Sequence, residues 1–188
     1  NVITQVTIPN FEDLKSGQWC AEFKKDLESF LNTHVTNDGP HSLEEIIAVG
    51  SKSAYAQSRL ESNLSASGRY GDKSIACGSA YTDPLRIAFR QSIEKVMNEL
   101  ALDALIYPSW NNKVATVKRF EEEYKGDNSQ VISPHTGQPA FTVPMGFTSE
   151  NLPTGLQFLG RMYDEASLIK LIYAYEQGTK HRKPADLK

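Results

Sequence analysis

Residues 140–160 read AFTVPMGFTSENLPTGLQFLG, and this stretch decides the fold of the chain. Its two apolar runs, residues 140–144 and 155–160, have the length of buried strands and are bounded by proline and glycine. We expect Pro144 to end the first strand, because proline has no N–H to donate to a strand ladder. A third apolar run, residues 104–108, is also closed by a proline. The three runs predict a buried sheet whose strand ends face a cleft, where ligands tend to bind.

Two helices are predicted beside these strands along the chain. Asp83 followed by Pro84 is typical of an N-cap with proline at the first helical position, and apolar residues extend this helix to about Ala101. Residues 164–177 predict an amphipathic helix that stops at Gly178. Helices that alternate with single apolar strands indicate an α/β layered domain. The side chains of the last helix expected to face inward are Ala166, Ile169, Leu171, Ile172 and Tyr175.

The first hundred residues are predicted to be mostly helical. Residues 2–8 alternate in polarity, which predicts a short strand closed by Pro9. Helical spacing follows over residues 20–31, and the capping box of Ser42 and Glu45 begins a helix through about residue 49. A further helix is expected over residues 55–61. The side chains of the first helical segment expected to face inward are Cys20, Phe23, Leu27, Phe30 and Leu31.

Composition excludes several classes of protein. The 188 residues are 39% hydrophobic and 23% charged, which is typical of one soluble globular domain. A net charge of -3 and a pI near 5.8 argue against a nucleic-acid surface. No apolar run approaches the roughly 20 residues that a membrane span needs. The basic cluster over residues 180–183 is interpreted as a solvated tail.

The two cysteines, Cys20 and Cys77, are too few for a disulfide-built scaffold and match no zinc spacing. We interpret them first as free or buried thiols; the alternative, a disulfide between them, stays open and would require an oxidising compartment. Asn63-Leu64-Ser65 is a glycosylation sequon, which matters only in a secreted protein. The chain begins at Asn1 without a methionine, so we expect that something upstream was removed or lies on another chain. These features lean toward a secreted or vacuolar, proteolytically matured protein.

No complete catalytic constellation is found in the chain. Ser92-Ile93-Glu94-Lys95 matches S-x-x-K, but it falls within a helix and lacks the motifs that accompany this nucleophile. Lys52 lies between two serines, with nothing nearby to lower its pKa. His135 is interpreted as a packed loop histidine, and no histidines have metal-ligand spacing.

Four segments in order carry a resemblance to a known family. Residues 103–108 read DALIYP, and residues 128–147 read NSQVISPHTGQPAFTVPMGF. LPTGLQFLGR follows at residues 152–161, and then a closing helix with Asp164-Glu165. The segments look like the D-x-L-I-x-P, P-A-x-x-V-P-x-G and L-P-x-G-L-Q-x-x-G stretches of the amidase-signature family. Each is weak alone, but their order and spacing are specific, and the first hundred residues match more loosely.

The resemblance implies an α/β fold: the C-terminal portion of an α/β/α sandwich with a mixed sheet. A missing N-terminal part or a partner chain would complete this fold. Residues 1–188 would form the C-terminal part of one such domain, with residues 1–101 mostly helical and residues 102–188 holding the strands and closing helix. The family cleaves carboxamides with a serine nucleophile, a second serine and a lysine, and no metal or organic cofactor is implied.

None of these catalytic groups can be assigned to a position in this sequence, because no G-G-S-S or G-S-D-x-G-G-S stretch occurs in it. What the resemblance implies for this chain is part of the wall of a substrate pocket. Asp127 aligns with a position that contacts the substrate amide in glutamine-using members of the family. The predicted wall residues are Tyr107, Trp110, Asn111, Asp127, Asn128, Gln130 and Ile132.

We carry two hypotheses for function. The first is the C-terminal chain of a proteolytically processed, two-chain amidase whose partner chain bears the Ser-Ser-Lys triad and whose substrate is a small amide. The second is a non-catalytic amidase-like protein for storage, defence or binding. A self-sufficient hydrolase that uses Ser92 or Lys52 is a third, weaker interpretation.

Overall fold

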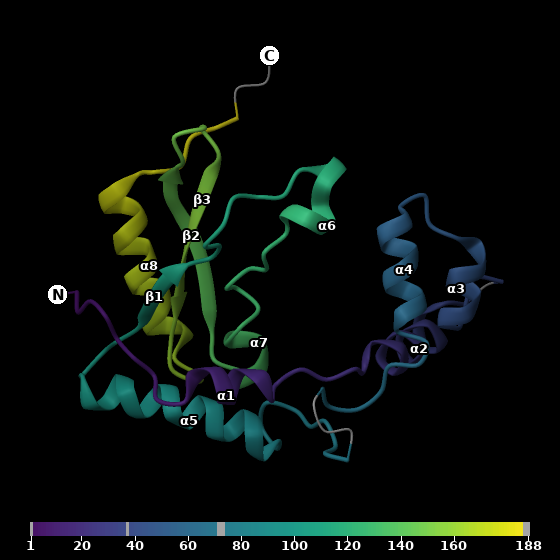
Figure 1. Cartoon of the computed structure of the whole chain (residues 1–188). Helices are drawn as coiled ribbons and strands as arrows, with labels where there is room; N and C mark the ends of the chain where they lie inside the picture. The colour runs from purple at the N-terminus through teal and green to yellow at the C-terminus, as the bar shows by residue number, and fades with distance from the viewer. Residues whose placement is uncertain (1, 37, 71–73, 186–188) are drawn as a thin grey trace. The chain divides into compact units, whose positions relative to one another are not determined.

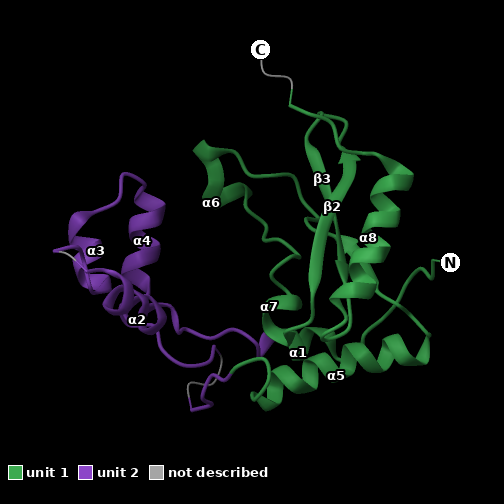
Figure 2. Ribbon diagram, turned by 180° about the vertical axis from the view of Figure 1, so that it is seen from behind, with its two compact units in different colours: residues 1–15, 79–188 green, residues 16–78 purple. Residues whose placement is uncertain are grey.

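The structure is a computed structural model that describes residues 2–36, 38–70 and 74–185. The chain divides into two compact units, which are coloured separately in Figure 2. Unit 1 comprises residues 1–15 and 79–188, and unit 2 comprises residues 16–78. The assignment of residues 1–188 to one larger domain, with a change of character near residue 101, stays a prediction.

Unit 1 is built on a three-stranded antiparallel sheet in the order β1-β3-β2 (Figure 1). The strands are β1 (Leu105–Pro108), β2 (Ala140–Phe147) and β3 (Pro153–Leu159). All three lie where the apolar runs predict them. The α/β fold class is therefore confirmed.

The prediction that Pro144 ends its strand is wrong. Strand β2 continues to Phe147 across a register shift between Pro144 and Gly146, so Met145 is an extra residue in the ladder. Within the described sheet, β2 pairs only with β3. Proline is tolerated at an edge strand and at a bulge, because neither position requires its missing N–H.

Two helices cover opposite faces of this sheet. Helix α8 (Glu165–Thr179) packs on one face, where Val143, Leu156, Phe158 and Leu168 form a buried cluster. Helix α5 (Pro84–Glu99) packs on the other face, where Phe89, Ile93 and Met97 meet Leu105 and Leu159. Figure 1 shows α8 running alongside β2 and β3, and α5 crossing near the end of the sheet. The layers of unit 1 are helix, sheet and helix, as in an α/β/α sandwich.

Helix α5 begins as predicted and ends two residues early. Asp83 accepts hydrogen bonds from the backbone N–H groups of Leu85 and Arg86 at 2.9 and 3.4 Å, and Pro84 follows as the first helical residue. These bonds satisfy N–H groups that have no partner within the helix. The expected N-cap is confirmed.

The strand predicted over residues 2–8 is wrong. This segment has no ladder partners among the described residues, and Gln5 at its centre has a φ of 63°; it leads into a short helix, α1 (Phe11–Ser16), that the sequence did not suggest. Val6, Ile8 and Phe11 pack against the α5 cluster, with the Phe11 and Phe89 rings 5.7 Å apart. Alternating apolar residues therefore cover a helix here, where a strand was expected.

Two details of α8 also differ from the prediction. The helix passes through Gly178 and stops at Lys180, whose φ is 49°. Ala166 and Ile169 are exposed, and the buried side chain is Leu168. The stripe against the sheet consists of Leu168, Leu171, Ile172 and Tyr175, which has the i, i+3, i+4, i+7 spacing of one helix face.

The described residues of unit 2 form three helices, all near their predicted positions. They are α2 (Phe23–His34), α3 (Leu43–Val49) and α4 (Ala54–Ser62). Ser42 caps α3 by accepting the Glu45 N–H at 3.2 Å, as the capping box predicts. Leu31 and Leu43 are buried, but Phe23 and Phe30, which we expected to face inward, are 46% and 57% exposed. Unit 2 thus has a small core for its length.

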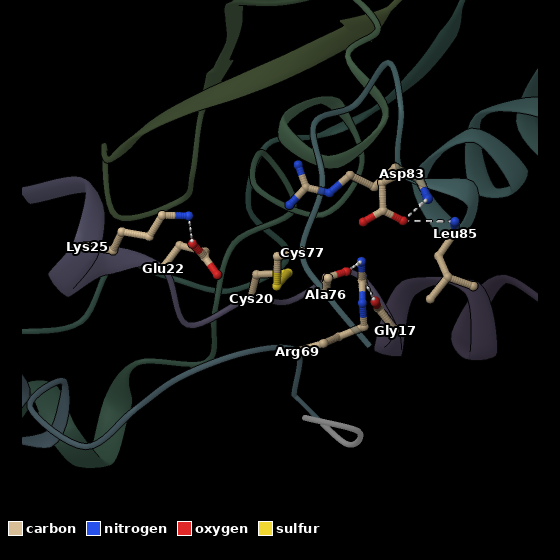
Figure 3. The surroundings of a disulfide bond; sticks show 10 residues. Gly17, Cys20, Glu22, Lys25, Arg69, Ala76, Cys77, Asp83 and Leu85 are labelled. Atoms are coloured by element: carbon tan, nitrogen blue, oxygen red, sulfur yellow. Dashed lines mark hydrogen bonds and ion pairs between the residues drawn. A yellow bond between two sulfur atoms is a disulfide. The ribbon is translucent and has the colours of Figure 1, made fainter. Parts of the chain in front are cut away.

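A disulfide joins Cys20 to Cys77, so the prediction of free thiols is wrong (Figure 3). The neighbouring segments are held by backbone bonds from Ala21 N–H to the Gly68 carbonyl at 2.8 Å and from Tyr70 N–H to the Trp19 carbonyl at 2.9 Å. The buried Arg69 guanidinium donates to the carbonyls of Gly17 and Ala76. The disulfide therefore closes unit 2 near its two ends.

In the part of the chain that the structure describes, no helix is both long and apolar enough to cross a membrane.

We predict that replacing both cysteines, with Cys20→Ser and Cys77→Ser, destabilises unit 2 by about 2–5 kcal/mol. The bond spans 57 residues, so its loss frees a long loop in the unfolded state, and the small core offers little compensation. Hydrogen exchange followed by mass spectrometry should show lost protection in α2, α3 and α4. Protection of α2 to α4 equal to that of the native chain would contradict this prediction.

Candidate functional site

The end of β1 is tied to a loop from later in the chain. The Asn128 N–H donates to the Ser109 carbonyl at 2.8 Å, and the Asn128 side-chain amide donates to the Pro108 carbonyl at 2.8 Å. Asn111 donates to the Asn128 side-chain oxygen at 3.4 Å. These bonds fix residues 109–111 against residues 127–132. Two of the predicted wall residues, Asn111 and Asn128, are thereby brought into direct contact.

Asp127 is the hydrogen-bond acceptor at the centre of the second loop. Gln130 donates to its carboxylate at 2.7 Å, and the Ser129 hydroxyl donates to it as well. The Tyr124 hydroxyl approaches the same carboxylate at 3.5 Å. Asp127 and Gln130 therefore lie together as predicted, but their polar groups already hold the loop in shape.

A cavity of about 590 Å³ lies beside β1 in unit 1. Four predicted wall residues line it: Tyr107, Asn111, Asn128 and Ile132. The other side is formed by residues 6–8 with Phe11, Glu12 and Lys15. Its size falls within the range of small-molecule sites. It brings together more of the predicted wall residues than the second cavity does.

Trp110 faces a second cavity, of about 460 Å³, over β2 and β3. Its ring meets that of Tyr124 edge-on, with centroids 5.7 Å apart. The same cavity is lined by Ser109, Thr142 and the basic residues 181–183. The predicted basic tail is exposed, yet it lies over the sheet, with Lys183 Nζ 5.4 Å from the centre of the Phe147 ring. Trp110 is therefore separated from the predicted residues that line the first cavity.

A polar row crosses the sheet between the two cavities. Gln157 on β3 is opposite Tyr107 on β1 and Thr142 on β2. Thr142 shares a hydrogen bond of 3.2 Å with the buried Ser109 hydroxyl. Neither the Tyr107 hydroxyl nor Gln157 Oε1 has a partner of standard hydrogen-bond geometry among the described residues. This row was not predicted, and its sequence signal is a glutamine within the apolar run 155–160.

Burial raises the pKa of Tyr107 to about 12, and the nearby Gln157 side chain opposes the rise only in part. The phenol therefore stays neutral at physiological pH. A neutral hydroxyl can donate or accept a hydrogen bond, but it cannot serve as a base there. Because this hydroxyl is buried opposite Gln157, Tyr107 does not offer it to the cavity.

The residues considered as nucleophiles or bases do not form a catalytic set. The Ser92 hydroxyl donates to the Pro9 carbonyl at 3.4 Å, and Lys95 is exposed, 3.8 Å from Glu99. Lys52 is exposed, and its neighbour Ser53 caps α4. His135 is buried in a short helix, α7 (Ser133–Thr136), as the packed histidine interpretation expects. No group of three or more metal-binding side chains occurs among residues 2–36, 38–70 and 74–185.

Comparison with known proteins agrees with the fold. A family model described as Amidase matches residues 1–169. The chain therefore belongs to the amidase family, and it corresponds to the C-terminal part of the amidase-signature domain.

Individual relatives match the same region. A probable amidase of Arabidopsis thaliana is 28% identical over 97% of this chain and 34% of its own length. A glutamyl-tRNA(Gln) amidotransferase polypeptide from Oceanobacillus iheyensis is 29% identical over 53% of this chain and 21% of its own length. The crystal structure of a peptide amidase from Stenotrophomonas maltophilia matches with a TM-score of 0.54 and 29% identity, over 94% of this chain and 35% of that one. The chain thus spans at most about a third of these relatives.

Gly155 lies where β1, β2 and β3 meet at the site, and we predict that Gly155→Ala destabilises the chain by about 1–3 kcal/mol. A Cβ at this position would lie 2.7 Å from Thr142 Cγ2 and 3.0 Å from Ser109 Oγ. Denaturant unfolding should show the loss as a lower midpoint.

Gly178→Ala is the matched control, because a Cβ there meets nothing within 4 Å and the position is helical. It should leave stability unchanged or raise it by less than about 1 kcal/mol. Equal effects of the two substitutions would show that Gly155 is not a close contact.

Proposed function

We propose that this chain forms the C-terminal part of an enzyme that hydrolyses a carboxamide C–N bond. In this proposal it is one chain of a processed, two-chain amidase, and the Ser-Ser-Lys triad lies on the other chain. The observation that carries the proposal is the joined pair of loops at the end of β1, which brings Tyr107, Asn111 and Asn128 to one cavity.

The chemistry of this wall suits a neutral amide. A carboxamide offers one carbonyl acceptor and N–H donors, and it carries no charge. The polar side chains that line the cavity beside Tyr107 are the amides of Asn111 and Asn128 and the hydroxyl of Thr7, with Glu12 and Lys15 at the far side. Side-chain amides can both donate to the carbonyl and accept from the N–H. A few placed polar groups in a mostly apolar cavity are what give such sites their orientation and specificity.

The proposed mechanism is the one that the resemblance to the amidase-signature family implies. The lysine on the other chain acts through the bridging serine to remove the proton of the nucleophilic serine. Attack on the amide carbonyl expels the amine and leaves an acyl-enzyme, and water then releases the acid. Backbone N–H groups of the other chain stabilise the oxyanion. The present chain contributes the pocket wall and its share of the sheet.

Two observations support a triad that lies outside residues 1–188. The 188 residues contain no glycine- and serine-rich signature. Ser53 caps α4, the Ser92 hydroxyl donates to the Pro9 carbonyl, and Lys95 lies 3.8 Å from Glu99, while Lys52 is exposed. A pocket wall without a nucleophile is of use to an enzyme only if another part of the enzyme brings the reactive group.

The second candidate is a non-catalytic amidase-like protein for storage, defence or binding. The hydrogen bonds of Asp127 favour it, because this carboxylate already accepts from Ser129 and Gln130 of its own loop. A fold that has lost its triad could keep the cavity for binding alone. The two candidates differ in whether an activated serine is present in the assembled protein.

We predict that the protein isolated from its source separates on a denaturing gel into two polypeptides, one of which is this chain of 21.0 kDa. A fluorophosphonate probe should label the other polypeptide and leave this chain unlabelled, because the probe reacts with an activated serine. Labelling is read by in-gel fluorescence before and after heat denaturation, which serves as the control.

A single labelled species that contains residues 1–188 and the signature would remove the two-chain arrangement but keep the amidase. Two polypeptides without labelling would favour the binding protein. Labelling of Ser92 itself would overturn the whole assignment.

We predict that Asn128→Ala lowers kcat/KM for the amide substrate about three- to tenfold, mostly through a higher KM. The substitution removes hydrogen bonds to Pro108 and Asn111, each of which contributes about 0.5–1.5 kcal/mol. Positioning of the wall should affect binding more than the chemical step. Asn112→Ala is the matched control, since Asn112 is exposed in the neighbouring loop. Equal kinetics for both variants would place the substrate elsewhere.

A further inference from the structure

The sequon Asn63-Leu64-Ser65 is the only Asn-X-Ser/Thr sequence in the 188 residues. It has no part in the proposed amidase site, which is built from unit 1. It lies at the end of α4 in unit 2, where the helix stops and the chain turns into a surface segment. The structure therefore places the sequon at the C-terminal end of a helix, at the start of an exposed segment.

The setting suits an attached sugar. Asn63 is the C-cap of α4, and Leu64 and Ser65 that follow are exposed. The Asn63 side-chain amide donates one hydrogen bond, to the Arg59 carbonyl at 2.7 Å. An amide nitrogen carries two hydrogens, and an N-glycosidic bond replaces only one of them. The bond to Arg59 can therefore persist when the sugar is present.

The Cys20–Cys77 disulfide is a second, independent observation in the same unit. Disulfides of this structural kind persist in oxidising compartments and are rare where cellular thiols are kept reduced. In eukaryotic cells the compartment that oxidises cysteines is also the one where sequons are read. The disulfide thus indicates that Asn63 passes through the compartment where it can be modified.

We propose that Asn63 is an N-glycosylation site and that the chain matures in an oxidising secretory compartment. The donor is an oligosaccharide on a polyprenyl diphosphate. A bond forms between Asn63 Nδ2 and C1 of the first sugar, the bond from C1 to the diphosphate oxygen breaks, and Nδ2 loses one proton. The lipid diphosphate leaves, and no oxidant or reductant is consumed.

The position of the glycan has a consequence for the assembled protein. A branched, hydrophilic sugar cannot be buried in an interface, so the C-terminal end of α4 must face solvent when any partner chain is bound.

The test begins with protein isolated from its source. Peptide-N-glycosidase converts a glycosylated asparagine to aspartate, and in heavy-oxygen water the new carboxylate carries the label. Trypsin releases residues 60–69, which contain this sequon alone. We expect labelled aspartate at position 63, and a peptide joining Cys20 to Cys77 before reduction. An unmodified Asn63 peptide would overturn the proposal, whether or not the disulfide is found.

Variants of the full protein secreted from a eukaryotic host provide the matched comparison. Ser65→Ala should abolish the mobility shift on deglycosylation, whereas Ser65→Thr should retain it, because threonine also completes the sequon. Asn63→Gln should behave like Ser65→Ala. A shift that survives in Ser65→Ala would contradict the proposal. The peptide measurement on native protein needs no variant and no activity, so its outcome does not depend on the amidase assignment.

Discussion

The constraint on which unit 1 depends is that β3 is paired on both edges and buried on both faces. Leu159 faces the α5 cluster and is fully buried, while Phe158 faces the α8 cluster. Successive strand residues point to opposite faces, so a slip of one residue would exchange the two sets. Both helix layers would then lose their cores together. The register of this one strand therefore fixes where β1 ends, and with it where the loops of the site can meet.

The site follows from that register in a short chain of causes. Tyr107 is opposite Gln157, so the next residues of β1 leave the sheet beside Gly155, where only a glycine leaves room for Thr142 and Ser109. The Ser109 carbonyl then receives the Asn128 N–H, which positions the second loop. The cavity beside β1 thus owes its shape to strand pairing several residues away. Charged side chains contribute little to the shape of this cavity, because the Asp127 carboxylate accepts its hydrogen bonds from Ser129 and Gln130 of its own loop.

The sequence predicts well where a local rule is sufficient. Asp83-Pro84 begins α5, and apolar runs bounded by glycine and proline become β1, β2 and β3. Prediction from the sequence fails where contacts with distant parts of the chain decide between locally possible structures. Alternation over residues 2–8 covers a helix, and Pro144 is accepted because β2 is an edge of the described sheet. The disulfide could not be foreseen either, because pairing depends on backbone geometry. Four of the predicted wall residues line one cavity. The polar row could not be predicted, because only the strand register places Gln157 opposite Tyr107 and Thr142.

The polar row of Tyr107, Gln157 and Thr142 helps to decide which groups of the described chain can contact a substrate. A buried hydroxyl or amide oxygen without a partner costs roughly 1–3 kcal/mol, and stable folds seldom keep such groups without a use. The Tyr107 hydroxyl and Gln157 Oε1 are two such atoms, and they belong to residues that are opposite one another in the β1–β3 pair, where the Gln157 side chain is a hydrogen-bonding neighbour of the phenol. Both atoms are shielded from solvent within the chain itself, so neither is offered to a substrate or to a second polypeptide. The polar row therefore belongs to the interior of the sheet, and the groups that the joined loops offer to the cavity are the side-chain amides of Asn111 and Asn128.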